Sequence, residues 1–241
     1  MVGPVRRVAA GLLLLVVSGT GTPRADAEDV GASDSRLTLW TELTAQYTLL
    51  VQVKRYPEAA AVAQDALRLA EQLFGPDHPN VAQALNDLGY LCQAQGHDAQ
   101  AEPLHRRALA IRERALGPED AAVAQSLTNL AKSYLAQGRY GEAAPLFTRS
   151  LALLETHAGF DHRRLADALD HLALTYSLQG NTAAAEPLFK RALALLDRPV
   201  AAPDPDRVTI LEHYAACVRK AGNLKEAEAL EARAQNARSL R

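Results

Sequence analysis

Two acid–histidine pairs are the side chains of this sequence best suited to binding a metal. Asp170 and His171 recur further along the chain as Glu212 and His213, at one period of an internal repeat. Carboxylate oxygens and imidazole nitrogens are ligands of zinc. Elements that repeat in this way would pack about 10 Å apart, whereas a metal–nitrogen bond is about 2 Å long. A metal-dependent protein that uses these four residues is therefore one hypothesis, and a polar surface without metal or other cofactor is the favoured one.

Other chemistry has little support in the sequence. No G-x-S-x-G, P-loop, G-x-G-x-x-G or H-E-x-x-H motif occurs, so we expect no enzyme. Cys92 and Cys217 are the two cysteines. If the chain is a linear stack, they lie three repeats apart, roughly 30 Å, which is too far for a disulfide, since its Cα atoms lie within about 7 Å. We expect two free thiols.

An internal repeat with an even, 42-residue period must position all these groups. Its phased glycines, alanines and leucines are Gly96, Gly138, Gly180 and Gly222; Ala101, Ala143, Ala185 and Ala227; and Leu104, Leu146, Leu188 and Leu230. A unit of this size cannot bury its apolar face alone and must stack on its neighbours. Alanine and leucine dominate the apolar set and only 5% of residues are aromatic, which favours helices over strands.

Each unit is expected to be a pair of antiparallel helices. In the third unit, apolar residues recur at helical intervals at Val123, Leu127, Leu130 and Tyr134. A glycine such as Gly138 follows, where positive φ ends a helix. We therefore predict an all-α, right-handed solenoid of about five stacked pairs over residues 36–241. The units are about 36–78, 79–120, 121–162, 163–204 and 205–241, and the last helix is a polar cap.

The first unit fits the repeat less well than the others. Strict phase places Tyr47 at a position where later units have glycine or alanine. Sliding the register by three residues gives Trp40-x2-Leu43-Thr44-x2-Tyr47, with about three extra residues before Ala59. We expect the slid register.

The N-terminal segment is typical of an export signal. Arg6 and Arg7 precede an apolar run at 8–17, and small residues follow at 25–27. We predict a signal peptide at 1–27 and a disordered tether at 28–35. The apolar run is about half as long as the ~20 residues of a membrane-spanning helix. We thus expect a periplasmic or secreted protein without a stable membrane anchor.

The charge balance argues against a nucleic-acid partner. The whole chain has a formal net charge of −2. Loss of 1–27 removes three arginines and one aspartate, leaving 23 basic and 27 acidic residues, a net charge of −4. A mildly acidic chain has no electrostatic attraction to a phosphate backbone, so we predict no nucleic-acid binding.

The phased residues resemble the tetratricopeptide repeat, whose signature is W-x2-L-G-x2-Y followed by A, F, A and P. The matching residues include Trp40, Leu43 and Tyr47; Leu88 and Gly89; Leu130, Ala131 and Tyr134; Ala143, Phe147 and Ser150; and Ala185, Phe189 and Ala192. The length of the period, with Ala101–Leu104, Arg107–Ile111 and Leu116–Asp120, is similar to the kinesin-light-chain subtype. The resemblance covers about residues 36–241.

The resemblance implies a mode of binding, in which the first helices of the pairs form a concave face that holds a peptide or a partner helix. The groove positions it implies are Gln83, Asn86, Asp87, Tyr90 and Gln93; Gln125, Thr128, Asn129, Lys132 and Leu135; Asp167, Asp170, His171, Leu174 and Ser177; and Thr209, Glu212, His213 and Arg219. Asn86 and Asn129 suit hydrogen bonds to the amides of a partner's backbone. A solvated polar helix face remains the alternative.

These observations predict a non-enzymatic scaffold that binds a protein or peptide on its concave face. The alternatives are a self-associating assembly factor and, with less support, a metal-dependent protein that uses Asp170, His171, Glu212 and His213. The sequence does not name the partner.

Overall fold

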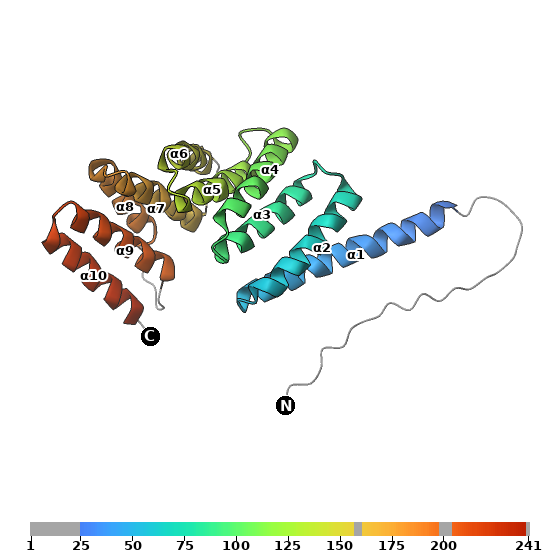
Figure 1. Cartoon of the computed structure of the whole chain (residues 1–241), viewed down its shortest axis with the longest axis horizontal. Coiled ribbons are helices and arrows are strands. Elements are labelled where there is room, and N and C mark those ends of the chain that lie inside the picture. The colour runs from blue at the N-terminus through green and yellow to red at the C-terminus, as the bar shows by residue number, and fades with distance from the viewer. Residues whose placement is uncertain (1–24, 157–160, 198–203, 240–241) are drawn as a thin grey trace, which may run out of the picture.

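The computed structural model of the 241-residue chain describes residues 25–156, 161–197 and 204–239, with side chains from Asp34 onward (Figure 1). All regular structure in these ranges is α-helical, which confirms the predicted fold class. The helices are α1 (Ala25–Gln52), α2 (Tyr56–Phe74), α3 (Pro79–Ala94), α4 (Asp98–Leu116), α5 (Ala121–Ala136), α6 (Tyr140–Thr156), α7 (His162–Leu178), α8 (Thr182–Leu195), α9 (Pro205–Lys220) and α10 (Leu224–Ser239). The expected signal peptide at 1–27 lies almost wholly outside the described residues.

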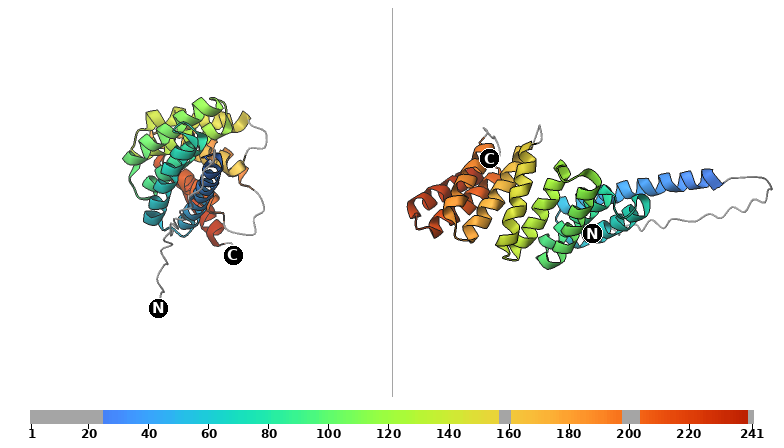
Figure 2. Two further views of the ribbon diagram at one scale, coloured as in Figure 1. Left: turned by 90° about the vertical axis from the view of Figure 1, so that its right-hand side faces the viewer. Right: turned by 90° about the horizontal axis from the view of Figure 1, so that it is seen from above.

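Consecutive helices form five antiparallel pairs, and each pair packs on the next to give a curved solenoid (Figures 1 and 2). The backbones of the neighbouring first helices α3, α5, α7 and α9 come close to one another, whereas the backbones of the second helices of adjacent pairs do not. Helices on the inside of a curve lie closer together than those on the outside. The first helices therefore line the concave face and the second helices the convex face.

The apolar core differs between the two ends of the solenoid. One continuous cluster runs from Leu109 to Ala234 and includes the fully buried rings of Phe147 and Phe189. Two smaller clusters fill the N-terminal part, one around Val81 and Leu85 and the other around Leu88 and Leu91. The core is thus continuous in the last three units and divided in the first two.

The turns within the pairs correct the register that we expected for the first unit. Gly96, Gly138, Gly180 and Gly222 all have positive φ, between 73° and 89°. Lys54, one period before Gly96, takes the same conformation with φ 57°, although left-handed backbone is unfavourable for a residue with a Cβ. The turn of the first unit therefore keeps the strict phase, and the slid register with three extra residues is wrong.

Strict phase leaves helix α1 poorly packed. Tyr47 stands where later units have Gly or Ala, and a large side chain there keeps two helices apart. No described residue of α1 is fully buried, and Leu49 of this helix is 63% exposed. A small hollow between α1, α2 and α3 is lined by Trp40, whose buried Nε1 has no hydrogen-bond partner in the described chain.

The expected disordered tether at 28–35 lies within α1, which starts at Ala25 (Figure 1). Once a helix has formed, extending it adds one hydrogen bond for each residue fixed, so a polar segment can continue a packed helix. None of the described helices is long and apolar enough to cross a membrane.

Aspartates cap most of the helices that open a new unit. Asp120, Asp161 and Asp204 accept hydrogen bonds from the backbone N–H two residues further on, at 2.7, 2.9 and 3.2 Å. His78 does the same for α3 through Nδ1, at 3.1 Å. Side-chain acceptors at this position satisfy N–H groups that the helix leaves unpaired. Each new first helix is thereby fixed at its start.

Candidate partner-binding face

The concave face carries a phased row of side-chain pairs. On α3 the Gln83 amide donates to Asp87 at 2.9 Å. On α5 the Gln125 amide donates to Asn129 at 3.0 Å. On α7, His171 Nδ1 lies 3.3 Å from the carboxylate of Asp167. The members of each pair are one helical turn apart, and successive pairs follow the period of the repeat. The repeat thus places one polar pair per unit on three neighbouring first helices.

The middle pair is neutral and has unused hydrogen-bonding groups. Gln125 Nε2 donates to Asn129 Oδ1, and neither Gln125 Oε1 nor Asn129 Nδ2 has a partner among the described residues. Both side chains are partly exposed. An acceptor and a donor side by side match the N–H and C=O of a peptide backbone. This unit can therefore hold a polypeptide without selecting its side chains.

The unit before it presents an acid and an aromatic ring. Burial raises the pKa of Asp87 to about 6, against the opposing hydrogen bonds from Gln83 and Tyr47. Gln83 is held from behind by Arg112, whose Nη2 donates to Gln83 Oε1 at 2.7 Å. Tyr90, one turn beyond Asp87, is 44% exposed. This end of the face offers a carboxyl group beside an apolar ring.

The unit after it presents a charged cluster. Lys132 Nζ of α5 lies 2.9 Å from Asp167 Oδ2 of α7. Burial raises the pKa of Asp167, but the hydrogen bond and charge of His171 and the charge of Lys132 outweigh it and hold the pKa well below its usual value. The ring of His171 rests on Phe147 with centroids 5.7 Å apart. Asp167 is therefore ionised and tied to both neighbours.

The four residues expected to bind a metal do not converge. His213 Nδ1 donates to Asp170 Oδ2 at 2.8 Å, which joins α9 to α7. His171 turns to Asp167, whose backbone oxygen lies 2.8 Å from His171 Nδ1, and Glu212 pairs with Arg238 of α10. No group of three potential ligands occurs in the part of the chain that the structure describes. Asp170 and His213 therefore bind each other, whereas His171 and Glu212 have other partners, and the four residues do not form one shared site in the described chain.

Four of the expected groove residues are buried instead of facing a partner. These are Asn86, Thr128, Asp170 and Ser177, which are 3%, 6%, 3% and 6% exposed. Asn86 donates to Ser126 Oγ at 3.1 Å, and Thr128 and Ser150 share a hydrogen bond of 2.8 Å. At this phase the side chain lies between helices, so Asn86 cannot read a peptide as we expected. Asn129, one position further round the helix, keeps that capacity.

A buried polar layer that sequence reasoning missed lies behind α3. His105 is fully buried, with Nδ1 3.1 Å from Asn86 Oδ1 and Nε2 3.3 Å from Gln93 Oε1. Arg112, 6% exposed, donates to Ser126 Oγ at 3.0 Å. The sequence did contain a signal, since Phe147 and Phe189 occupy the phase of His105 in the next two units. A histidine at a phenylalanine position indicates a polar interior.

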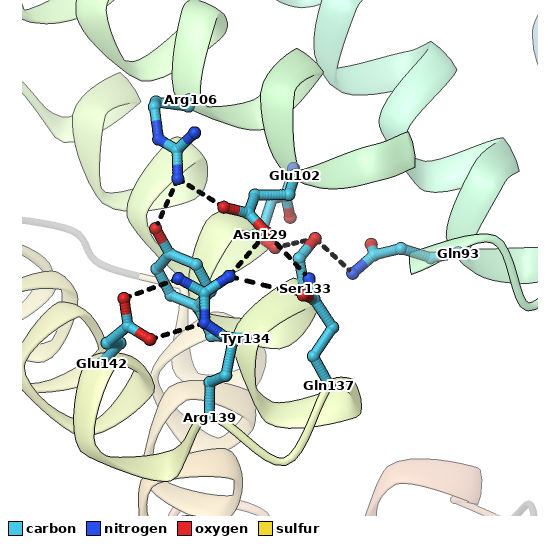
Figure 3. Close-up of polar contacts among 9 residues, drawn as sticks. All are labelled: Gln93, Glu102, Arg106, Asn129, Ser133, Tyr134, Gln137, Arg139 and Glu142. Atoms are coloured by element: carbon cyan, nitrogen blue, oxygen red, sulfur yellow. Dashed lines mark hydrogen bonds and ion pairs between the residues drawn. The ribbon is translucent and has the colours of Figure 1, made fainter. Parts of the chain in front are cut away.

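A second network braces the turn between α5 and α6 (Figure 3). Glu102 of α4 accepts hydrogen bonds from Arg139 at 2.8 Å and from Gln137 at 3.1 Å. The Arg139 guanidinium lies 4.2 Å from the centre of the Tyr134 ring, and Arg106 donates to the Tyr134 hydroxyl at 2.9 Å. These contacts fix the second unit on the third, so the central part of the concave face is held in a defined shape.

Family models for the tetratricopeptide repeat match residues 48–114, 99–156 and 165–196, which together make up more than half of the chain. This chain is a tetratricopeptide-repeat protein. Solved structures with the same fold include kinesin-light-chain-like repeats. Among curated proteins, no sequence matches.

Several solved structures share the fold of this tetratricopeptide-repeat protein. A putative kinesin light chain of Podosopora anserina with nearly identical TPR-like repeats has 21% identity, covers 82% of this chain and 95% of its own, and gives a TM-score of 0.67. BtubC (BKLC) from P. vanneervenii has 20% identity over 88% and 85% of the two chains, with a TM-score of 0.70. MamA from Desulfovibrio magneticus RS-1 has 14% identity over 83% and 94%, with a TM-score of 0.57. At these identities the likeness concerns the fold alone.

Proposed function

We propose that this tetratricopeptide-repeat protein is a non-enzymatic scaffold that holds a segment of another protein along α3, α5 and α7. The observation that carries the proposal is the phased row of pairs Gln83–Asp87, Gln125–Asn129 and Asp167–His171. An extended chain rises about 3.3 Å per residue and neighbouring first helices lie about 10 Å apart. A segment crossing the face therefore meets a new unit about every three residues.

The decisive experiment removes the middle pair. The double variant Gln125→Ala/Asn129→Ala takes away the unpartnered amide groups and leaves the buried layer intact. Its matched control is Gln64→Ala/Gln100→Ala, which removes exposed amides from the second helices α2 and α4. Proteins captured from a cell-envelope extract are compared by quantitative mass spectrometry. We expect partner recovery to fall at least tenfold for the groove variant only. Equal recovery by the wild type and both variants would contradict the binding face.

We also propose that the protein is exported and processed after Ala27, from the pattern of residues 1–27. The supporting features are the basic start, the short apolar run and the small residues before Glu28. Cell fractionation followed by intact-mass measurement tests this. A mass that begins at Glu28 in the envelope or medium fraction is expected, and a cytosolic chain that retains 1–27 would refute export.

Self-association is a second candidate function, favoured by one observation on α1. Leu39 and Leu49 of α1 are 47% and 63% exposed, and Val53, in the turn directly after α1, is 65% exposed. In the following unit, the residues equivalent to Leu39 and Leu49 are Val81 and Leu91, which are 0% and 1% exposed because α2 covers them. Light scattering over a hundredfold range of protein concentration checks this function. A mass that rises for the wild type but not for Leu49→Ser/Val53→Ser supports it, and a constant monomer mass rejects it.

A further inference from the structure

An arginine–glutamate pair joins the second helices of successive units. Arg107 of α4 reaches Glu71 of α2 at 2.7 Å. Its equivalents are Arg149 to Glu113 at 2.5 Å and Arg191 to Glu155 at 2.6 Å. All six residues keep the phase of the repeat. The convex side thus carries three copies of one contact, in which an arginine binds a carboxylate from the unit before it.

The fourth copy of this contact is incomplete. The phase places Arg233 of α10 opposite residue 197, which is Asp and has one methylene fewer than Glu. Asp197 is engaged elsewhere, since Arg207 Nη2 lies 3.2 Å from its Oδ1. Arg207 itself replaces an apolar residue that is buried in earlier units, such as Val123. Arg233 forms no ion pair or side-chain hydrogen bond within the described ranges.

Arg233 lies at a hollow of about 360 Å³ between α8, α9 and α10. Its walls combine apolar groups with polar ones: Lys190, Leu193, Tyr214, Glu226, Leu230 and Arg207. Lys190 is paired with Glu186, and Tyr214 donates to Glu226 at 2.8 Å. Among the described residues that line this hollow, Arg233 is therefore the cation whose hydrogen-bonding capacity is unused.

We propose that this hollow receives a carboxylate side chain of a partner protein, bound by Arg233 as Arg107, Arg149 and Arg191 bind their glutamates. The three internal contacts define the ligand chemistry, which is a carboxylate on a short apolar stem. The planar guanidinium suits this group, because it can donate two parallel hydrogen bonds to a carboxylate. The hollow is separate from the row of pairs on α3, α5 and α7, so the two sites can be tested independently.

The probe is N-acetylglutamate amide, which presents one glutamate side chain and no other charge. Arginine Nε–H signals are followed by NMR at constant ionic strength while the probe is added until the response saturates. We expect a saturable shift at Arg233 and little change at the internally paired arginines. N-acetylglutamine amide, a neutral analogue of the same shape, should have no effect. Equal responses to both probes, or equal saturation by acetate without the stem, would overturn the proposal.

Two variants make the test specific. Asp197→Glu lengthens the internal carboxylate by one methylene, so it should occupy Arg233 and weaken probe binding at least threefold. Glu113→Gln removes the partner of Arg149 and should make that arginine respond to the probe as well. Circular dichroism checks that both variants keep the wild-type helix content. If Arg233 still binds with wild-type affinity in Asp197→Glu and Arg149 stays silent in Glu113→Gln, the proposed relation between the contacts is wrong.

Discussion

Two junctions between helices use a histidine in opposite ways. The N-terminal junction lies between α3 and α4, and the C-terminal junction lies between α7 and α9. At the N-terminal junction, the imidazole of His105 is fully buried between the amides of Asn86 and Gln93. At the C-terminal junction, His213 is partly exposed and donates to the buried carboxylate of Asp170. A neutral imidazole has one N–H, which can donate to either of these two amide oxygens. A carboxylate instead favours the protonated ring.

The difference teaches that the repeat fixes where a side chain lies but not which interaction it makes. Around His105 the polar layer interrupts the apolar core, which is split into separate clusters. Around Phe147 and Phe189, at the same phase, the core is continuous. A buried polar network is stable only when each member has a partner. The N-terminal junction therefore depends on complete hydrogen bonding, and the C-terminal units depend on apolar packing.

The largest effect is expected from Gly89→Ala, because a Cβ at this position would lie 2.3 Å from His105 Cε1. The His105 ring is fully buried, so we expect a loss of about 3 kcal/mol in the free energy of unfolding, although alanine is the better helix former. Urea denaturation measures it. Adding His105→Ala to Gly89→Ala should recover part of the loss, and a Gly89→Ala variant as stable as the wild type would refute the tight contact. The matched control, Ala131→Gly in α5, should cost about 1 kcal/mol from helix propensity.

The next effect separates the two asparagines that we first grouped together. Asn86→Ala leaves His105 and Ser126 without their buried partner, so it should destabilise the protein by about 2 kcal/mol. Asn129→Ala lies at the exposed face and should change stability by less than about 0.5 kcal/mol. Urea denaturation of both variants checks this. Equal losses would mean that Asn86 is not part of a buried network.

Folding should also shift the pKa values of the two histidines in opposite directions. Burial lowers the pKa of His105 to about 4, from 6.5. The unfolded chain then binds more protons between pH 4 and 6.5, so stability from this junction falls as the pH falls through that window. The hydrogen bond from His213 to Asp170 raises the pKa of His213. The contribution of His213 to the free energy of unfolding is full at a pH below the pKa of this residue in the unfolded chain. It is lost as the pH rises through the raised pKa of His213 in the folded protein.

Histidine ring signals in NMR give both pKa values directly. We expect His105 to stay neutral at a pH between its two pKa values, while His213 is protonated there. Asp170→Asn should return the pKa of His213 toward its usual value and leave that of His105 unchanged. If both rings titrate together near the usual histidine pKa, the contrast between the junctions does not exist.

The smallest effect concerns the convex arginines, which form the same contact in successive units. Arg107→Ala and Arg149→Ala each remove one partly exposed ion pair, and such pairs contribute about 0.5 kcal/mol. We expect equal, small losses in the free energy of unfolding that shrink at high salt. If one variant loses several times more free energy of unfolding than the other, then the ion pairs, and not the buried layers, distinguish the N-terminal from the C-terminal units.

Much of the fold was predictable because the repeat determines local geometry. The phased glycines indicated turns, and positive φ at Gly96, Gly138, Gly180 and Gly222 bears this out. The first unit was misread because Lys54 adopts a backbone conformation that its residue type disfavours. Stacking of the following unit can hold a turn against local preference, which a sequence pattern does not report.

The binding face was only partly predictable, for a related reason. The sequence by itself determined the helix pairs, the period of the repeat and which side of each first helix lies on the concave face. Only the tertiary structure decided that Asn86, Thr128 and Asp170 turn inward while Gln125 and Asn129 stay outside. One residue along a helix is a rotation of about 100°, so neighbouring positions belong to different surfaces. Which of them faces a partner depends on where the next helix packs, and that is set by contacts between successive units, such as Asp170 with His213.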